Sequence, residues 1–185
     1  MDIKKTANLL LNFTIKRVAE IFGIIVFTSG TFLLISLITY SPDDPNFIFP
    51  ENTEIKNLLG FQGSFVSDLF FQSVGLISYL IPLTFILTGI NIFRLKEFFL
   101  LIENIFFTII YCVFGTLFFS YFYTDAFTLY INGNGGFVGN FLNESVFLKL
   151  EFLNNKITYY FSLITFILLF VLSLNPNSYW IKIFI

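Results

Sequence analysis

Four apolar stretches without a charged residue constrain the fold of this chain more than any other feature of its sequence. They cover residues 21–40, 69–93, 104–123 and 157–174. As α-helices they would extend about 30, 37, 30 and 27 Å, close to the thickness of about 30 Å of a hydrocarbon core. A membrane β-barrel would show short alternating strands instead. The pattern predicts an all-α integral membrane protein, a four-helix bundle.

Composition supports a lipid environment. Of the 185 residues, 56% are hydrophobic and only 12% are charged, and the mean hydropathy is +0.83. A soluble domain carries about 25% charged residues. A single cysteine and no histidine exclude an internal disulfide and argue against a zinc site. The net charge of −2, with scattered lysines and arginines, argues against direct contact with nucleic acid.

The distribution of cations predicts the orientation. Most of them precede the first span, lie between the second and third, or follow the fourth: Lys4, Lys5, Lys16, Arg17, Arg94, Lys96 and Lys182. The other two connections hold Lys56, Lys149 and Lys156. By the positive-inside rule both termini are cytoplasmic. We therefore expect a cytoplasmic N-terminal segment, residues 1–20, and a four-helix transmembrane domain, residues 21–182.

The stretch SPDDPNF directly follows the first span. Its two prolines push the residues before them out of helical geometry, so the helix is expected to end near Tyr40, whose ring suits the headgroup region. Asp43 and Asp44 would then stand in water. Two adjacent carboxylates on a short turn supply too few oxygens for a cation site. We expect no bound metal.

The spans hold few polar groups. Glu20 and Glu103 lie at the predicted cytoplasmic edges, Glu20 close to Arg17 and Glu103 close to Arg94 or Lys96. No acid lies near the midplane, where a proton or ion path would require one. Only serine and threonine were expected at that depth.

Two further features predict how the spans bend and pack. Pro82 predicts a mild kink in the second span. Small residues recur every four positions in the third span and predict a packing seam, either within the bundle or between copies. These are Thr108, Cys112, Thr116 and Ser120.

Both outer connections are expected to carry short interfacial helices. In the first, Asn52 or Thr53 would begin a short turn that Gly60 and Gly63 end. In the second, apolar residues recur over residues 137–150. The glycines ahead of that segment do not form G-x-G-x-x-G, because Val138 occupies the last position. No cofactor site is therefore predicted.

Several short motifs occur in a characteristic order along the chain. They are an S-P-x-D-P turn (Ser41, Pro42, Asp44, Pro45), an N-x-x-G-x-x-G segment (Asn57, Gly60, Gly63), a start to the second span with Asp68, Leu69, Phe71, Gly75, Tyr79, Ile81 and Pro82, a G-G-x-x-G segment (Gly135, Gly136, Gly139), and Ser178 with Trp180. Their order and spacing resemble the N-terminal four-transmembrane-helix domain of the FtsK/SpoIIIE family of DNA translocases. The matched positions look architectural, and none is expected to be catalytic.

The resemblance implies a multi-pass anchor in the bacterial inner membrane, at the division septum. In that family the domain holds a cytoplasmic hexameric ATPase that pumps chromosomal DNA and links segregation to cell division. It implies homo-oligomerisation, contact with membrane lipid and division-site proteins as partners. These 185 residues contain no G-x-x-x-x-G-K-[ST] phosphate loop, so no enzyme activity is expected of them, whether the chain is a fragment or a stand-alone anchor. The alternative is a small transporter or channel subunit.

Overall fold

The computed structural model describes residues 3–45, 54–124, 132–147 and 156–175, which are helical with short connections and contain no strand. The elements are α1 (Ile3–Ile38), α2 (Gly60–Val74), η1 (Gly75–Tyr79), α3 (Leu80–Leu95), α4 (Phe99–Phe122), α5 (Gly136–Leu142), η2 (Asn143–Phe147) and α6 (Lys156–Ser173). Four helical segments among them are long and apolar enough to cross a membrane. The predicted all-α fold with four spans is confirmed.

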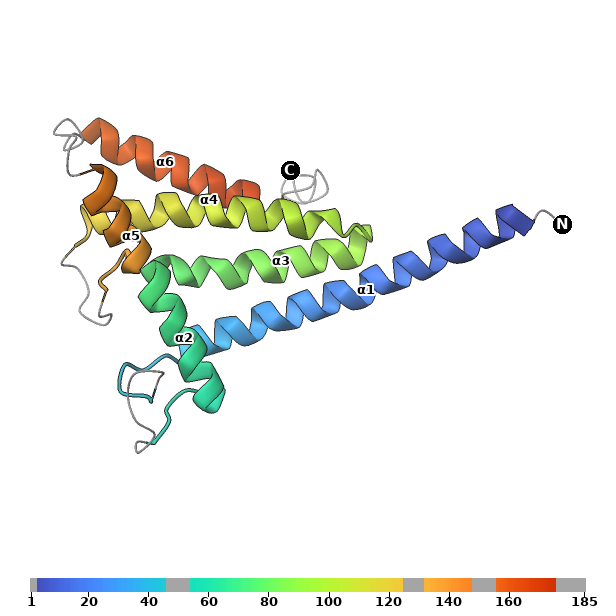
Figure 1. The fold of residues 1–185 in the computed structure, drawn as a ribbon, viewed down its shortest axis with the longest axis horizontal. Helices are drawn as coiled ribbons and strands as arrows, with labels where there is room; N and C mark the ends of the chain where they lie inside the picture. The colour runs from blue at the N-terminus through green and yellow to red at the C-terminus, as the bar shows by residue number, and fades with distance from the viewer. Residues whose placement is uncertain (1–2, 46–53, 125–131, 148–155, 176–185) are drawn as a thin grey trace, which may run out of the picture.

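The long helices lie side by side in the order α1, α3, α4, α6 (Figure 1). α1 packs along α3, and α4 packs along α6. α2 crosses the end of α1 at an angle, and α5 lies beside the end of α4 (Figure 1). Both outer connections therefore lie at one end of the molecule, and the α3–α4 turn lies at the other.

Helix α1 begins at Ile3, so the helix extends well ahead of the predicted span of residues 21–40. Residues 3–20 contain no proline or glycine and are mostly good helix formers, so nothing interrupts the helix. Its 36 residues extend about 54 Å, well beyond the hydrocarbon thickness, and its N-terminal part projects past the other helices (Figure 1). The cytoplasmic placement of residues 1–20 stays a prediction.

The second span is broken rather than mildly kinked, and the break is not at Pro82. α2 ends at Val74. The next residue, Gly75, has a φ of 61° that only glycine adopts readily, and it begins the 3₁₀ turn that leads into α3. Pro82 lies in the first turn of α3, where its missing N–H has no intrahelical acceptor to lose. The bend therefore lies at Gly75, and Pro82 is accommodated in the first turn of the helix that follows.

The helix in the first outer connection also differs from the prediction. Gly60 and Gly63 do not end a turn: α2 begins at Gly60, and Gly63 is buried within it. Gly60 has a φ of 65° and donates its N–H to the Asn57 carbonyl, which turns the chain into the helix. The proposed caps Asn52 and Thr53 lie outside the described residues.

Close approach of two backbones holds α1 on α3. A Cβ added at Gly23 would lie 2.7 Å from the Phe93 nitrogen and 2.8 Å from the Gly89 carbonyl oxygen. Since lipid supplies no hydrophobic drive between helices, this close contact is the packing that membrane helices depend on.

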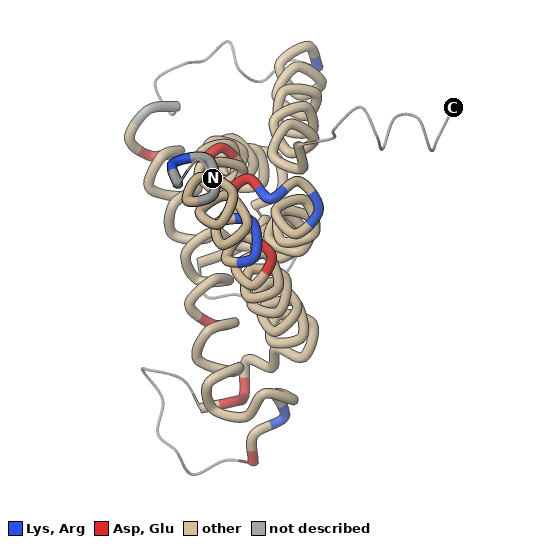
Figure 2. Tube along the Cα trace, turned by 90° about the vertical axis from the view of Figure 1, so that its right-hand side faces the viewer, with Lys and Arg blue, Asp and Glu red and all other residues tan. Residues whose placement is uncertain are grey.

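Charged residues gather mainly at helix ends and in the connections, as Figure 2 shows. At the α3–α4 end, the Glu20 carboxylate accepts from Arg17 at 2.5 Å and from Lys96 at 2.8 Å. Glu20 therefore pairs with Arg17 as expected, and it also pairs with Lys96, which was expected near Glu103. Glu103 accepts a hydrogen bond from the Asn175 amide at 3.5 Å.

Candidate functional site

Six of the motif residues lie in two clusters at the end of the molecule that carries α2 and α5. The first junction comprises Ser36, Asp44, Asn57, Gly63 and Asp68, where the end of α1 meets the start of α2. The second junction comprises Gly75, Ser120, Asn134, Gly136 and Asn140, where the break after α2 meets α4 and α5. Each joins segments that are far apart in the sequence.

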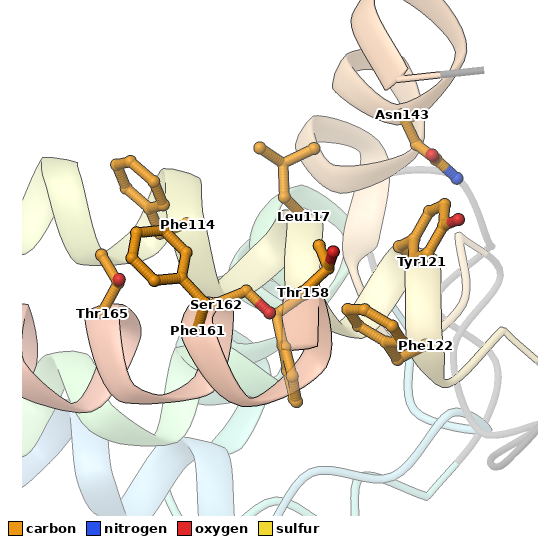
Figure 3. A pocket seen from close by; sticks show the side chains of 10 residues that line it. Phe114, Leu117, Tyr121, Phe122, Asn143, Thr158, Phe161, Ser162 and Thr165 are labelled. Atoms are coloured by element: carbon orange, nitrogen blue, oxygen red, sulfur yellow. The ribbon is translucent and has the colours of Figure 1, made fainter. Parts of the chain in front are cut away.

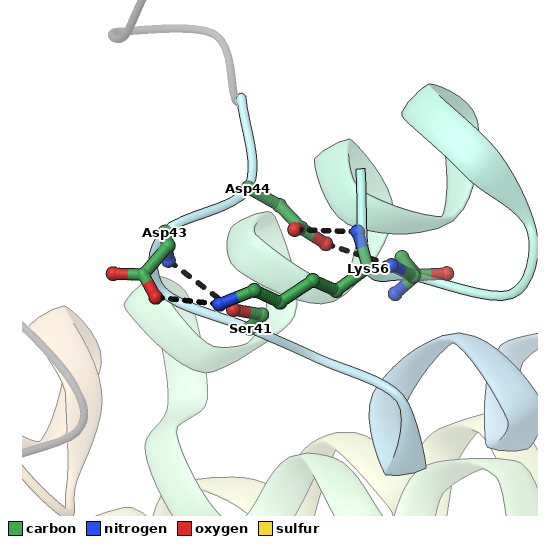
Figure 4. A network of polar contacts seen from close by, with 5 residues as sticks. Ser41, Asp43, Asp44 and Lys56 are labelled. Carbon is green, nitrogen blue, oxygen red and sulfur yellow. Dashed lines mark hydrogen bonds and ion pairs between the residues drawn. The ribbon is translucent and has the colours of Figure 1, made fainter. Parts of the chain in front are cut away.

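Asp44 organises the first junction (Figure 4). Its carboxylate accepts from the backbone N–H of Lys56 at 2.8 Å and from that of Asn57 at 2.9 Å. Only 2% of Asp44 is exposed, so the expectation that it stands in water was wrong. The carboxylate is tolerated in this position because two donors satisfy it.

Asp43 behaves as expected and stands in water. Its side chain is 74% exposed and pairs with the Lys56 ammonium at 2.9 Å. That hydrogen bond, together with the Asp43 charge, raises the pKa of Lys56. The two neighbouring acids therefore have different roles: Asp44 binds backbone, and Asp43 makes a surface ion pair.

Asn57 connects the end of α1 to the start of α2. Its amide donates to the Ser36 carbonyl at 2.9 Å, and its side-chain oxygen accepts from the Leu59 N–H at 3.1 Å. The Ser36 hydroxyl donates to the Gly63 carbonyl at 2.6 Å. Carbonyls near a helix end lack intrahelical partners, and Asn57 supplies one for α1. A Cβ on Gly63 would clash with the Asn57 side chain, which explains the glycine.

Asp68 bonds to Tyr40, two residues beyond the end of α1. The Tyr40 hydroxyl donates to an Asp68 oxygen at 3.1 Å, and the Gln72 amide donates to the same oxygen at 3.4 Å. The Tyr40 ring packs on Phe71, with ring centroids 4.7 Å apart. Burial, and then the Asp68 charge, raise the pKa of Tyr40 well above its usual range. The phenol is therefore held as a neutral donor.

Tyr40→Phe is expected to lower the free energy of unfolding by about 1 kcal/mol at neutral pH, the usual net contribution of one hydrogen bond. Because the folded pKa of Tyr40 exceeds the unfolded value of about 10, this contribution is complete below pH 10 and is lost as the pH rises further. Calorimetry of both proteins in detergent from about pH 8 to 11 measures the difference. Lys56, whose pKa is also raised, is present in both proteins, so its contribution to the pH dependence cancels in the difference. A difference that does not change with pH would contradict this role.

The second junction is held by backbone and amide groups. The Asn134 carbonyl accepts from the Leu76 N–H at 2.9 Å, and the Asn134 amide donates to the Tyr123 carbonyl. The Ser120 hydroxyl donates to the Asn140 side-chain oxygen at 2.8 Å. A Cβ on Gly136 would lie 2.6 Å from the Gly75 nitrogen. The glycines of the second outer connection therefore allow its backbone to pack directly on the backbone that follows α2.

The expected seam on α4 is divided among different neighbours. Thr116 and Ser120 face the second junction: a Cβ on Gly139 would lie 2.5 Å from the Thr116 carbonyl oxygen. Cys112 packs against the buried cluster that contains Ile77 and Tyr111. Thr108 donates to the Asn104 carbonyl of its own helix at 2.7 Å. Thr116 and Ser120, the C-terminal half of this row, therefore pack within the chain against the second junction.

Several junction residues were missed from the sequence. Ser36, Asn134 and Asn140 belong to none of the sequence motifs. The available signal was the asparagines that stand among the glycines of the second outer connection. A buried side-chain amide can donate hydrogen bonds to backbone carbonyls that have no partner within a helix. The motif residues Ser178 and Trp180 lie outside the described residues.

The junctions are suited to holding helices at fixed angles. Within residues 3–45, 54–124, 132–147 and 156–175 there is no group of three or more histidine, cysteine or acidic side chains that could hold a metal ion. The polar groups of both junctions mostly bond to one another and to backbone. Their arrangement can fix the positions of the helices and connections at this end of the molecule.

Comparisons with known proteins identify the family. The model of the 4TM region of DNA translocase FtsK/SpoIIIE matches residues 15–182. DNA translocase FtsK of Rickettsia prowazekii (strain Madrid E) is 35% identical over 69 residues, 37% of this chain and 9% of that protein. DNA translocase FtsK of Rickettsia bellii (strain RML369-C) is 36% identical over 78 residues, 42% of this chain and 10% of that protein.

A more distant relative is DNA translocase FtsK of Rhizobium meliloti (strain 1021), 28% identical over 78 residues, which are 42% of this chain and 9% of that protein. The matches thus span about a tenth of the length of these relatives. No solved structure matches the chain. Since the family model covers nearly all of the sequence, the chain belongs to the family of the 4TM region of DNA translocase FtsK/SpoIIIE.

Proposed function

We propose that this chain is the membrane-anchoring, septum-targeting and assembly domain of an FtsK-like DNA translocase that acts in cell division and chromosome segregation. The observation that carries the proposal is the family match over residues 15–182, which includes all four candidate spans except the start of the first. The proteins that share this region are named DNA translocases. The anchor itself needs no catalytic group.

The geometry supports an anchor in a second way. Four spans return the chain to the side on which it began, and the end of α6 lies beside the start of α4, where Asn175 contacts Glu103. A cytoplasmic motor that followed residue 175 would thus be attached on the same side as the N-terminus. Assembly as a hexamer follows from the family resemblance, and the outer junctions would present the surface that division-site proteins contact.

A polar row between the helices bears on the transporter alternative. The expectation of only serine and threonine was incomplete: Tyr111 bonds to Thr84 at 3.2 Å, and the Asn104 amide donates to Thr88 at 2.6 Å. These groups are neutral and bond mainly to one another, which is how polar side chains join membrane helices. They provide no charged path, so the anchor remains the better proposal.

A fluorescent fusion tests the septal role. Expressed at native level in dividing cells, the fusion should collect at midcell, and the Asp44→Ala variant should remain in the membrane but collect less. Asp43→Ala, which changes the neighbouring exposed acid, should collect like the wild type. Even fluorescence around the whole membrane for the wild type would count against septum targeting.

A further inference from the structure

A groove runs between α4 and α6 on the outer half of the molecule, with a volume of about 260 Å³. Figure 3 shows the side chains that line it. Most of the lining is aromatic and aliphatic: Phe114, Leu117, Phe118, Phe122 and Phe161. Phe161 is 70% exposed, so the groove opens on the surface. The protein leaves this groove unfilled along the outer half of two spanning helices.

The groove lies between two helices that can span a membrane, so its surroundings are lipid. A water molecule occupies about 30 Å³ of liquid, so the groove is several times larger than one water, and apolar cavities do not hold water. An open apolar groove between membrane helices is therefore filled by hydrocarbon. An acyl chain is the hydrocarbon that the bilayer supplies.

The surface of the groove is almost entirely apolar, but three of the side chains at its outer end carry polar groups. Asn143, Tyr121 and Thr158 line it there, while Thr165 and Phe114 lie toward the other end (Figure 3). The side-chain oxygen of Asn143 is buried and accepts no hydrogen bond from the residues that the structure describes. A buried acceptor without a donor is costly, so this oxygen indicates a ligand with an N–H or O–H group.

Charged residues of both signs are close in sequence to the residues at this end. Glu144 directly follows Asn143 and is exposed, and Lys156 begins α6 two residues before Thr158. An acid beside an acceptor suits an ammonium group, and a lysine suits a phosphate. This combination matches a zwitterionic headgroup that carries hydrogen-bond donors, which phosphatidylethanolamine has and phosphatidylcholine lacks.

We propose that the groove between α4 and α6 binds one phospholipid of the phosphatidylethanolamine type, from the leaflet on the side of the outer connections. Its acyl chain lies along Phe114, Phe118 and Phe161, and its ammonium group donates to the Asn143 oxygen. The bound lipid completes the packing of α6, which otherwise contacts the rest of the chain mainly through α4. This proposal does not depend on the septal role.

Photolabelling tests the site. The full chain is placed in nanodiscs with phosphatidylethanolamine that carries a diazirine in its acyl chain, irradiated, and mapped by mass spectrometry. Label is expected in residues 114–122 and 158–165. Phosphatidylcholine with the same acyl chain should label these residues about fivefold less, the ratio that one net hydrogen bond produces. Equal labelling by both lipids, or label spread evenly over α1 and α3, would overturn the proposal.

Three variants separate the two parts of the site. Ser162→Trp fills the groove and should abolish the label, whereas Ile164→Trp, on an exposed position of α6 that does not line the groove, should keep it. Asn143→Leu should keep the label but lose the preference for phosphatidylethanolamine. Unchanged protection of the Cys112 thiol shows that each variant is folded. Loss of label equally in both tryptophan variants, an unchanged preference in Asn143→Leu, or cross-links between two copies through this groove would contradict lipid binding.

Discussion

Asp44→Ala is expected to lower the free energy of unfolding of the outer end by about 3 kcal/mol, since each buried donor left without an acceptor costs about 1–3 kcal/mol. The two donors are the backbone N–H groups of Lys56 and Asn57, which the carboxylate holds at 2.8 and 2.9 Å. Both would lose this acceptor at once. Asp44→Asn retains one acceptor oxygen and should cost roughly half as much.

Hydrogen exchange in detergent measures this effect where it arises. The amides of Lys56 and Asn57 should exchange much faster in Asp44→Ala, and Asp44→Asn should fall between it and the wild type. Asp43→Ala is the matched control, because the Asp43 carboxylate is 74% exposed and pairs with the Lys56 ammonium at the surface. Equal protection of these amides in both alanine variants would show that Asp44 does not organise the junction.

The different behaviour of Asp43 and Asp44 shows how far sequence reasoning reaches. Composition and the prolines predicted that the chain leaves the membrane after Tyr40, and α1 does end at Ile38. They could not predict that one carboxylate turns inward. That outcome depends on two N–H groups more than ten residues further along the chain, whose position is set only when α2 packs across the end of α1.

The long helices were the most predictable part of the fold. In hydrocarbon, continuous apolar helices are stable and backbone groups without a hydrogen-bond partner are costly. Their exact limits were less predictable. The apolar run of the second span continues through Gly75, so hydropathy alone reads it as one helix. Only tertiary contact reveals the break, because Gly75 meets the backbone of residues 134–136 there.

The candidate site was predictable in its glycines and acids but not in its partners. Family resemblance singled out Asn57, Gly63 and Asp68, and the structure brings all three to the first junction. Their partners Ser36 and Tyr40 come from the end of α1, 21 and 28 residues away in the pairs with Asn57 and Asp68. A local pattern carries no information about such pairs.

Gly75→Ala should be the most damaging small substitution at the outer end. The φ of 61° and ψ of −138° at Gly75 place it where a side chain is strained by about 1–3 kcal/mol. In addition, the new methyl would collide with the Asn134 carbonyl and lie 2.8 Å from the Gly136 nitrogen. These neighbours are backbone atoms and cannot move aside independently. Overpacking of this kind adds about 1–3 kcal/mol, so we expect a total loss of about 2–6 kcal/mol.

Gly133→Ala separates the two causes. Gly133 also has a positive φ, 69°, but an added Cβ there meets nothing within 4 Å, so only the backbone strain of about 1–2 kcal/mol remains. Thermal unfolding in detergent can be followed through the reaction of a thiol dye with Cys112, the only cysteine. Gly75→Ala should unfold at a clearly lower temperature than Gly133→Ala. Equal midpoints would mean that the contact of Gly75 with residues 134–136 does not hold the second junction together. The bend after α2 would then require only a flexible residue.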